Sequence, residues 1–221
     1  ERLAGIICLI AISTISIQVY PDVNLVDFAT IVMSLVLTSF FSFMIFSNYR
    51  KTHEQLTLLA TIDPLTLSGN RRALDRKLSD VIADQTRQPS TVSLLLLDLD
   101  LFKKINDEYG HAVGDQTLVE VASLITENTR SLDALYRYGG EEFIIMPLKI
   151  NLVEAMALAE NLRILVENHK FSSHIKLTIS VGVAEYRAGE TAESWIHRAD
   201  SALYTAKDLG RNRVVAETEV E

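Results

Sequence analysis

The sequence is poor in cysteine, proline and basic residues, and each scarcity excludes a class of protein. Cys8 is the only cysteine, so a small secreted fold held together by disulfides is excluded. Four prolines and nine glycines in 221 residues, without repeats or low-complexity tracts, argue against a collagen-like fibre or a disordered chain. A net charge of -8 leaves no basic footprint for duplex nucleic acid, although a few local cations can still hold a nucleotide.

Charge is also scarce in the first fifty residues, which contain five charged side chains, whereas the other 171 contain 19 Lys and Arg and 26 Asp and Glu. Residues 3–20 contain no charge, and residues 25–46 contain only Asp27, near their start. As helices these segments would be roughly 27 Å and 33 Å long, enough to cross a bilayer. Residues 21–24, with the sequence PDVN, suit a turn. The pattern predicts a transmembrane hairpin over residues 1–47, with a buried core helix or an uncleaved signal sequence as the alternative for the first segment.

Positive charges flank this apolar region on one side. Arg2 precedes the first segment, Arg50 and Lys51 follow the second, and the connecting turn has neither Lys nor Arg, so both ends are expected in the cytoplasm. Residues 48–62 lack Gly and Pro, and we expect them to continue the second helix as a linker. An apolar stripe on this linker could pair with a second copy, but three positions leave self-pairing open. These positions are Leu56, Leu59 and Ile62.

From residue 63 onwards helical and strand periods alternate, which predicts a single α/β domain over residues 63–221. Asp63 and Pro64 interrupt the preceding helix. The predicted helices cover residues 74–82, 118–126, 152–166 and 195–209. The predicted strands cover residues 92–97, 134–138, 143–146, 177–183 and 214–215, of which 92–97 is expected to be a buried central strand.

Acidic residues follow two of these strands. Asp98 ends the buried strand, and Glu141 and Glu142 lie beside the hairpin turn that begins with Gly139 and Gly140. If the strands are neighbours, the carboxylates repel one another unless a cation is bound between them. An all-oxygen site suits Mg²⁺, whereas the five histidines and single cysteine show no spacing typical of zinc ligands. The two glycines let the backbone turn sharply and let a nucleotide approach it.

The strings RYGGEEF at residues 137–143 and DLDLFKKIND at residues 98–107 resemble the GGDEF family, the bacterial diguanylate cyclases, in its GGEEF variant. Further blocks of the family pattern occur at residues 63–66, 70–72, 110–111, 114–115, 206–207 and 210–212. Residues 67–69 read LSG, where the family usually has Gly and Leu after the threonine, and we expect only a local change of the turn there. The resemblance covers about residues 60–215.

The resemblance implies an α/β fold like that of nucleotidyl cyclases and polymerase palms, with a five-stranded central sheet flanked by helices. It implies one GTP per domain, and two domains of a homodimer that together make one cyclic di-GMP, with release of two pyrophosphates. It assigns catalysis to Asp98, Glu141 and Glu142, with Glu142 as a further ligand or a proton acceptor. Mg²⁺, or alternatively Mn²⁺, would be held by Asp98, the backbone carbonyl of Leu99 and Glu141.

The same resemblance implies which residues bind the substrate. The backbone N–H groups of Leu101 and Phe102, the Lys103 side chain, and Lys207 with Arg211 would hold the triphosphate. Because Lys207 and Arg211 are four residues apart, we expect them on one face of the last helix, with a solvated basic face as the alternative. The residues assigned to guanine are Asn106 and Asp115.

Alternatives stay open for several of these residues. Asp115 could instead cap a helix, and Asn106 could stabilise a turn. For His111, core packing and nucleotide contact are equally compatible with the sequence. Gly139 and Gly140 could form an ordinary hairpin turn rather than a nucleotide contact.

Arg130 and Asp133 form an RxxD motif five residues before the glycine pair, the place of the family's inhibitory site for cyclic di-GMP. The alternative is a surface ion pair. In some members the following helix supplies a second arginine, whereas here Asn161 occupies that place and Arg163 lies two residues on, which argues against tight inhibition.

The prediction from the whole sequence is a multi-pass protein of the bacterial inner membrane with its cyclase domain in the cytoplasm. Three rival functions remain at this point. The domain could be an inactive sensor of GTP or cyclic di-GMP, a cyclase that accepts ATP, or a structural membrane adaptor. The input signal cannot be read from these residues.

Overall fold

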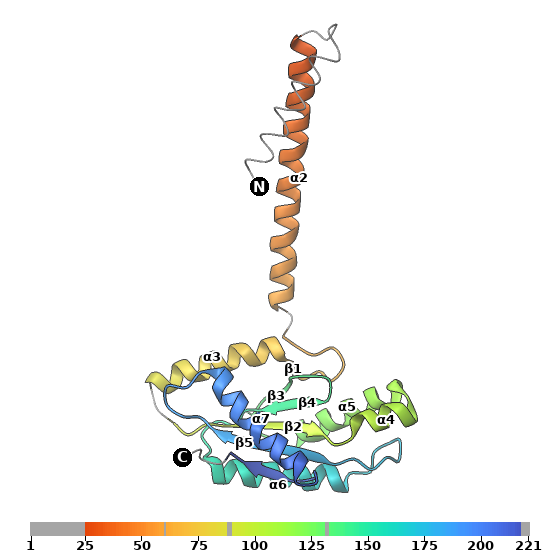
Figure 1. Ribbon diagram of the computed structural model, residues 1–221, viewed down its shortest axis with the longest axis vertical. Helices are drawn as coiled ribbons and strands as arrows, with labels where there is room; N and C mark the ends of the chain where they lie inside the picture. The colour runs from red at the N-terminus through yellow and green to blue at the C-terminus, as the bar shows by residue number, and fades with distance from the viewer. Residues whose placement is uncertain (1–24, 60, 88–89, 131–132, 218–221) are drawn as a thin grey trace. The chain divides into compact units, whose positions relative to one another are not determined.

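The computed structural model describes residues 25–59, 61–87, 90–130 and 133–217 (Figure 1). The chain divides into two compact units, Glu1–Leu59 and Ala60–Glu221, and each is described by itself. The first predicted membrane segment, residues 3–20, lies outside the described residues, so the hairpin stays a prediction.

Helix α2, Leu25–Leu59, contains the second predicted segment and continues without a break past it. Residues Val26–Arg50 are long and apolar enough to cross a membrane, and no other helix in the described ranges meets this criterion. Its large apolar side chains, such as Phe40, Phe43 and Ile45, are exposed.

The second unit is built on a mixed sheet of six strands in the order β1-β3-β4-β2-β5-β6. β2 pairs antiparallel with both β4 and β5, and β3 pairs antiparallel with β4, whereas β1 and β6 are parallel edge strands. The strand bounds are β1 Gly69–Asn70, β2 Ser93–Leu99, β3 Leu135–Arg137, β4 Glu142–Ile145, β5 Ile179–Glu185 and β6 Val214–Ala216.

The expectation of five strands is therefore wrong by one. The additional strand, β1, has two residues and pairs in parallel with Tyr136 and Arg137 of β3. Two residues are too few to show the alternation by which strands are recognised in a sequence. The turn before it, in the stretch that departs from the family pattern, places Leu67 in the left-handed conformation with φ 58°. This conformation costs a leucine about 1–2 kcal/mol relative to a right-handed one, and glycine would adopt it without strain.

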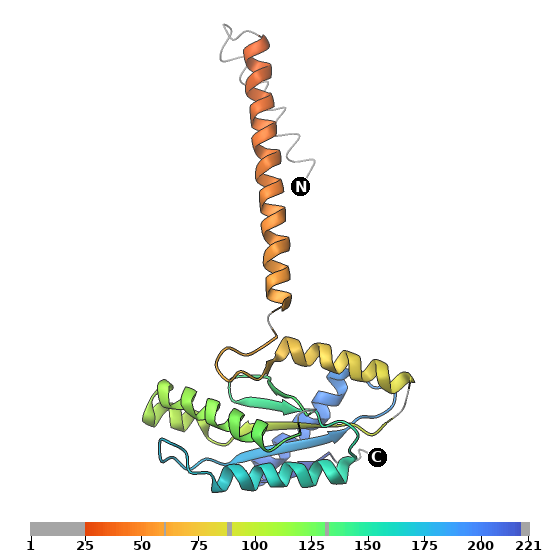
Figure 2. The ribbon, with the colours of Figure 1, turned by 180° about the vertical axis from the view of Figure 1, so that it is seen from behind.

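Helices cover both faces of the sheet. Figure 1 shows α7 crossing in front of the strands, and Figure 2 shows α5 and α6 on the opposite side. The helix bounds are α3 Arg71–Arg87, α4 Phe102–Tyr109, α5 His111–Glu127, α6 Leu152–Asn168 and α7 Ala192–Asp208. Gly110, with φ 86°, separates α4 from α5 because this backbone conformation interrupts a right-handed helix.

The central strand β2 is buried on both faces, as its continuous apolar run predicts. Because side chains alternate along a strand, Leu95, Leu97 and Leu99 join the core under α4, α5 and α6. Leu94 and Leu96 join the core under α3 and α7. The same alternation determines which face of the sheet carries the side chain of Asp98, near the end of β2.

Candidate active site

Asp98 lies on the α3/α7 face of the sheet, because it follows Leu94 and Leu96 in the alternation of β2. It pairs in register with Glu142 of β4 on one side and with Ser180 of β5 on the other. Its side chain is buried, with 5% of the residue exposed. The Asp98 Oδ2 atom accepts a hydrogen bond from Lys207 Nζ of α7 at 2.8 Å. The sequence interpretation gave Lys207 to the phosphates and did not foresee this ion pair.

The hairpin between β3 and β4 brings the other acids to the same place. The N–H groups of Tyr138 and Gly139 donate to the carbonyl of Glu142 at 2.9 and 3.3 Å, which closes the turn. A Cβ atom on Gly139 would collide with the Glu142 carboxylate, whereas one on Gly140 would meet nothing within 4 Å. A side chain at Gly139 would therefore require the Glu142 carboxylate to move, whereas Gly140 borders open space.

The electrostatics show that these carboxylates act on one another. Burial is the main cause that raises the pKa of Asp98, and the opposing hydrogen bond and charge of Lys207 do not cancel it. Burial also raises the pKa of Glu141 and of Glu142, and the negative charge of Asp98 adds to both shifts. Keeping all three ionised costs free energy, and a bound divalent cation would offset this cost.

The donor atoms fit a hard divalent cation. Asp98 and Glu141 supply carboxylate oxygens, and the backbones of Leu99 and Glu141 are adjacent because the Leu99 N–H donates to the Glu141 carbonyl at 3.3 Å. Across the described ranges, no three Asp, Glu, His or Cys side chains are grouped so that they could hold a metal ion. The available set is thus two carboxylates and a backbone carbonyl, all oxygen donors.

The groups expected to hold phosphates come from two elements. Helix α4 begins at Phe102, after Leu101 in the left-handed conformation, and no side chain caps its first N–H groups. The Phe102 side chain is buried, so only its backbone can serve a ligand, and Lys103 is exposed. An uncapped helix start of this kind attracts anions.

The expectation that Lys207 and Arg211 share a helix face is wrong. Helix α7 ends at Asp208, and Gly210 turns the chain with φ 111°, so Arg211 lies in a turn beyond the helix. Both cations nevertheless act on the same acid, because the charges of Lys207 and Arg211 both lower the pKa of Asp98. The two residues are therefore brought near Asp98 by the tertiary fold and not by helical spacing.

The residues assigned to guanine lie on α4 and α5. A Cβ atom on Gly114 would collide with the Asn106 amide, so these helices touch where Asn106 meets the residue before Asp115. Asp115 is exposed in the second turn of α5, whose N-cap is Gly110, so it does not cap the helix. His111 is exposed at the start of α5, which removes core packing as its role.

The RxxD residues are divided between surface and interior. Arg130 is exposed and Asp133 is buried, and the Asp133 N–H donates to the Arg130 carbonyl at 2.9 Å. Residues 131–132 lie outside the described part of the chain. On α6, Asn161 is exposed. Arg163 instead forms ion pairs with Glu160 and Glu167 on its own helix.

One residue that the sequence interpretation did not assign to the site is Asp100. It is 7% exposed and hydrogen-bonded to Thr178, Ser180 and Asn212. The string Asp-Leu-Asp at residues 98–100 was a signal for it, but sequence alone does not distinguish the two acids. Alternation puts both on the same side of the backbone, and only the hydrogen bonds show that they differ.

Arg137 connects the first turn of the domain to the glycine turn of the site. Its Nη1 atom bonds to Asp63 Oδ1 at 3.1 Å, and its Nη2 atom donates to the Gly140 carbonyl at 2.8 Å. Burial alone would raise the pKa of Asp63, but hydrogen bonds from Thr66 and Arg137 outweigh it and lower the pKa below its usual 3.8. The ionised carboxylate of Asp63 therefore stabilises the fold.

Replacing Asp63 by asparagine is expected to lower the free energy of unfolding by about 1–2 kcal/mol at neutral pH, because a charge-assisted hydrogen bond is lost. The folded pKa lies below the unfolded one, so this contribution is present above the unfolded pKa and is lost as the pH falls through the folded pKa. Thermal melts from pH 7 downwards measure it, with Asp80→Asn, an exposed acid on α3, as the control. No difference between the variants at neutral pH would contradict the expectation.

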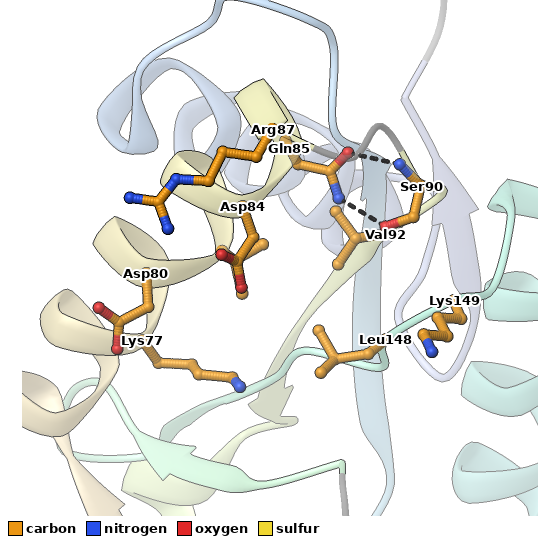
Figure 3. Close-up of a pocket in the computed structure, with 10 residues that line it drawn as sticks. Lys77, Asp80, Asp84, Gln85, Arg87, Ser90, Val92, Leu148 and Lys149 are labelled. Atoms are coloured by element: carbon orange, nitrogen blue, oxygen red, sulfur yellow. Dashed lines mark hydrogen bonds between the residues drawn. The ribbon is translucent and has the colours of Figure 1, made fainter.

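A separate cavity of about 530 Å³ lies at the other end of β2 (Figure 3). It is lined by Val92, which precedes the strand, whereas Asp98 lies near the strand's far end. Gln85 and Ser90 are joined by two hydrogen bonds of 2.9 Å at this cavity. It is therefore not part of the acidic site.

Residues 60–213 match the family described as "Diguanylate cyclase, GGDEF domain". Response regulator PleD of Caulobacter vibrioides, strain NA1000 / CB15N, is 41% identical over 163 residues, which are 71% of this chain and 36% of PleD. This chain thus spans about a third of the length of that relative.

Two crystal structures are similar in fold. The coiled coil and GGDEF domain of DgcB from Caulobacter crescentus, in complex with c-di-GMP, is 34% identical with a TM-score of 0.68, covering 83% of this chain and 99% of that one. The active GGEEF domain of a diguanylate cyclase from Vibrio cholerae is 33% identical with a TM-score of 0.65, covering 68% of this chain and 97% of that one.

Proposed function

Because this chain belongs to the GGDEF family of diguanylate cyclases, we propose that its second unit condenses two GTP molecules into cyclic di-GMP with release of two pyrophosphates. The observation that carries the proposal is the placement of Asp98. This buried acid faces Glu142 across the sheet and contacts Lys207 of α7. Acids, cations and an uncapped helix start meet at one end of the central strand, as nucleotidyl transfer requires.

In this proposal Asp98, Glu141 and the carbonyl of Leu99 hold a divalent cation, with Mg²⁺ preferred and Mn²⁺ as an alternative. When bound, the cation favours ionisation of the attacking 3′-hydroxyl and neutralises charge on the α-phosphate. Glu142, beside Asp98, serves as a further ligand or takes up the proton. The Vibrio cholerae structure, an active GGEEF domain, supports activity with glutamate at the place of Glu141, where GGDEF has aspartate.

The chain's cations and helix start bind and orient the triphosphate. Lys207 and Arg211 act with Lys103 and the backbone N–H groups of Leu101 and Phe102. Each domain binds one GTP, so the 3′-hydroxyl must come from a GTP on a second copy of the chain. A homodimer is therefore part of the proposal.

Guanine is recognised in this proposal by Asn106 and Asp115, which lie near each other where α4 meets α5. The exposed Asp115 carboxylate can accept hydrogen bonds from the N1–H and N2–H₂ groups of guanine. Adenine presents no such pair of donors, so this contact favours GTP over ATP. His111, exposed at the start of α5, is available to the nucleotide, and Gly140 leaves room for it.

Product binding and membrane attachment complete the proposal. The DgcB structure contains c-di-GMP, which supports feedback binding by related domains, and we assign it here to Arg130 and Asp133. Because Arg163 forms ion pairs with its neighbours on α6, it is not available to bind the product at that site.

Residues 1–47, with the exposed apolar part of α2, would anchor the chain in the inner membrane. Residues 48–62 would join the anchor to the cytoplasmic cyclase domain at 63–221.

The full chain in detergent or nanodiscs, incubated with GTP and Mg²⁺ or Mn²⁺, tests this function by mass spectrometry of the product. Cyclic di-GMP is expected, with little turnover of ATP. Asp115→Asn should weaken the preference for GTP over ATP by about 10–100-fold, the effect of losing a charged hydrogen-bond partner. Tight binding of GTP without product under both metals would instead favour the sensor alternative, and equal turnover of ATP would overturn the guanine assignment.

A further inference from the structure

Asp100 is a buried acid whose carboxylate accepts hydrogen bonds from two side chains and one backbone N–H group. Its Oδ1 atom accepts from the Ser180 hydroxyl at 2.7 Å. Its Oδ2 atom accepts from the Thr178 hydroxyl at 2.7 Å and from the Asn212 N–H at 3.0 Å. Three of the roughly four acceptor positions of a carboxylate are thus filled by protein donors. Asp100 therefore connects the end of β2 to the start of β5 and to the turn after α7.

That turn has a strained backbone. Gly210, Arg211 and Asn212 are left-handed in succession, with φ 111°, 65° and 47°. This conformation costs Arg211 about 1–2 kcal/mol, whereas asparagine adopts it more readily. Such a conformation persists only where the surroundings hold it in place, and such strain is concentrated at functional sites.

The turn is held from three sides. The Arg211 N–H donates to the Ala206 carbonyl at 3.0 Å, which fixes the turn to α7. Asp100 holds the Asn212 backbone. The Asn212 side chain forms hydrogen bonds with two residues of α6. It accepts one from Arg163 Nη1 at 2.6 Å and donates one to Glu167 Oε1 at 2.7 Å. Of these, only Asp100 lies beside the catalytic acid in the sequence.

The strained turn carries Arg211. A cavity of about 630 Å³ is lined by Arg211 together with Asp100, Asn212 and Leu101, the residue that precedes α4. The turn therefore places Arg211 in the lining of the same cavity as Leu101, the residue before the helix start to which the triphosphate is assigned. The charge of Arg211 also reaches Asp98, whose pKa it lowers.

We propose that Asp100 is a positioning residue that fixes the left-handed turn at Asn212 and so directs Arg211 onto the phosphates of the substrate. The proposal rests on the proposed function in one respect, because it takes Arg211 to be a phosphate ligand. It separates two acids of one motif, since Asp98 serves the metal and Asp100 serves the arginine.

Charge alone makes the opposite prediction. Asp100 is an anion near a site for anions, so removing its charge should strengthen phosphate binding if only Coulomb repulsion matters. If Asp100 acts by positioning Arg211, its removal should weaken phosphate binding. The sign of the change therefore decides between the two.

Isothermal titration of the full chain with inorganic tripolyphosphate measures this effect without any need for turnover. Asp100→Ala is expected to weaken affinity about tenfold, as is Arg211→Ala. The double variant should be no weaker than Arg211→Ala alone, because both changes remove one interaction. Asp100→Asn should stay within about threefold of the original chain, since its oxygen can face Thr178 and Asn212 while its amide donates to the Ser180 hydroxyl. Unchanged or tighter binding by Asp100→Ala, or additive effects in the double variant, would overturn the proposal.

Kinetics and a second variant complete the test. Asp100→Ala should raise KM for GTP more than it lowers kcat, and leave the metal concentration for half-maximal activity unchanged, whereas a metal ligand would shift that concentration. If Asp100→Ala does not fold, Thr178→Val combined with Ser180→Ala removes two donors that hold the carboxylate, and several-fold weaker tripolyphosphate binding is expected. Unchanged binding in that variant would refute the proposal. Failure of GTP turnover in the unaltered chain would count against the proposed function, and the tripolyphosphate result would still be read separately.

Discussion

Replacing Asp98 by asparagine is expected to reduce cyclic di-GMP synthesis at least about 10³-fold, which corresponds to about 4 kcal/mol of lost transition-state stabilisation. Asparagine has nearly the same shape but no negative charge with which to hold a divalent cation. Its amide oxygen can still accept a hydrogen bond from the Lys207 ammonium, but the attraction between opposite charges is lost. Glu141→Gln should have a loss of similar size, because the two carboxylates share one proposed cation.

The same replacement is expected to raise the midpoint of thermal unfolding of the metal-free protein. Burial raises the folded pKa of Asp98 above its ordinary 3.8, despite the ion pair with Lys207. The folded state therefore favours the neutral form, and asparagine supplies a neutral side chain at every pH. Lys207 is 33% exposed, so its ammonium can reach water when the partner is lost. Loss of activity with gain of stability would distinguish a functional acid from a structural one.

The pH dependence has a definite sign. A carboxyl group with a raised folded pKa contributes stability that is fully present below its unfolded pKa and is lost as the pH rises through the folded pKa. In thermal melts of the metal-free original chain from pH 7 downwards, this contribution to stability should therefore grow as the pH falls through the folded pKa of Asp98, and Asp98→Asn should lack it. Added Mg²⁺ should stabilise the original chain more than the variant. Glu127→Gln, at the exposed end of α5, is the control.

Two results would contradict this account. Substantial synthesis by a dimeric Asp98→Asn preparation would remove Asp98 from the catalytic role. A lower melting midpoint with the pH dependence unchanged would mean that the ion pair with Lys207 outweighs the cost of burial.

Replacing Gly182 by alanine is expected to destabilise the cyclase domain by about 3 kcal/mol, at the upper end of the range for overpacked cores. Gly182 lies on β5 opposite Leu96 of the central strand. An added Cβ would collide with the Ala199 carbonyl and the Leu203 N–H of α7. Both are backbone atoms, so no side chain can rotate away and the helix itself must move.

Thermal unfolding measures this change, and a fall of roughly 6–12 °C is expected for a domain of this size. The activity should fall as well, because α7 carries Lys207 to Asp98. Gly140→Ala is the matched control for stability, since its Cβ would meet nothing within 4 Å. An unchanged melting midpoint for Gly182→Ala would show that α7 is not held this closely to the sheet.

The local elements of the cyclase domain were largely predictable. The apolar run at 92–97 begins one residue before β2 and covers its first five residues, the helical period at 152–166 lies in α6, and that at 195–209 passes the end of α7 by one residue. Short elements, and elements that depend on contacts distant in the sequence, could not be predicted. β1 has two residues, so periodicity could not show it, and α4 appeared only as a helix start inside a recognised motif.

The sequence predicted which residues belong to the site, but it predicted fewer of the contacts between them. Motif spacing singled out Asp98, Glu141 and Glu142, and the sheet register pairs Asp98 with Glu142. It misplaced Arg211 by assigning it to a helix face, whereas this residue lies in the turn after α7. It also left two roles open for His111, core packing and nucleotide contact, and the exposure of His111 on α5 excludes core packing.

Local residue patterns were enough to predict the apolar segment of α2, the alternation of strands and helices, and the acids and cations of the GGDEF pattern. The partner of each of these groups depends on the three-dimensional packing. Lys207 bonds to Asp98, whereas Asp100 accepts a hydrogen bond from the Asn212 N–H. The physical reason is that these contacts join residues more than a hundred positions apart, so their geometry depends on how β2 and the end of α7 pack together. Neighbours in the chain do not encode that packing, and two identical acids two residues apart can therefore have different tasks.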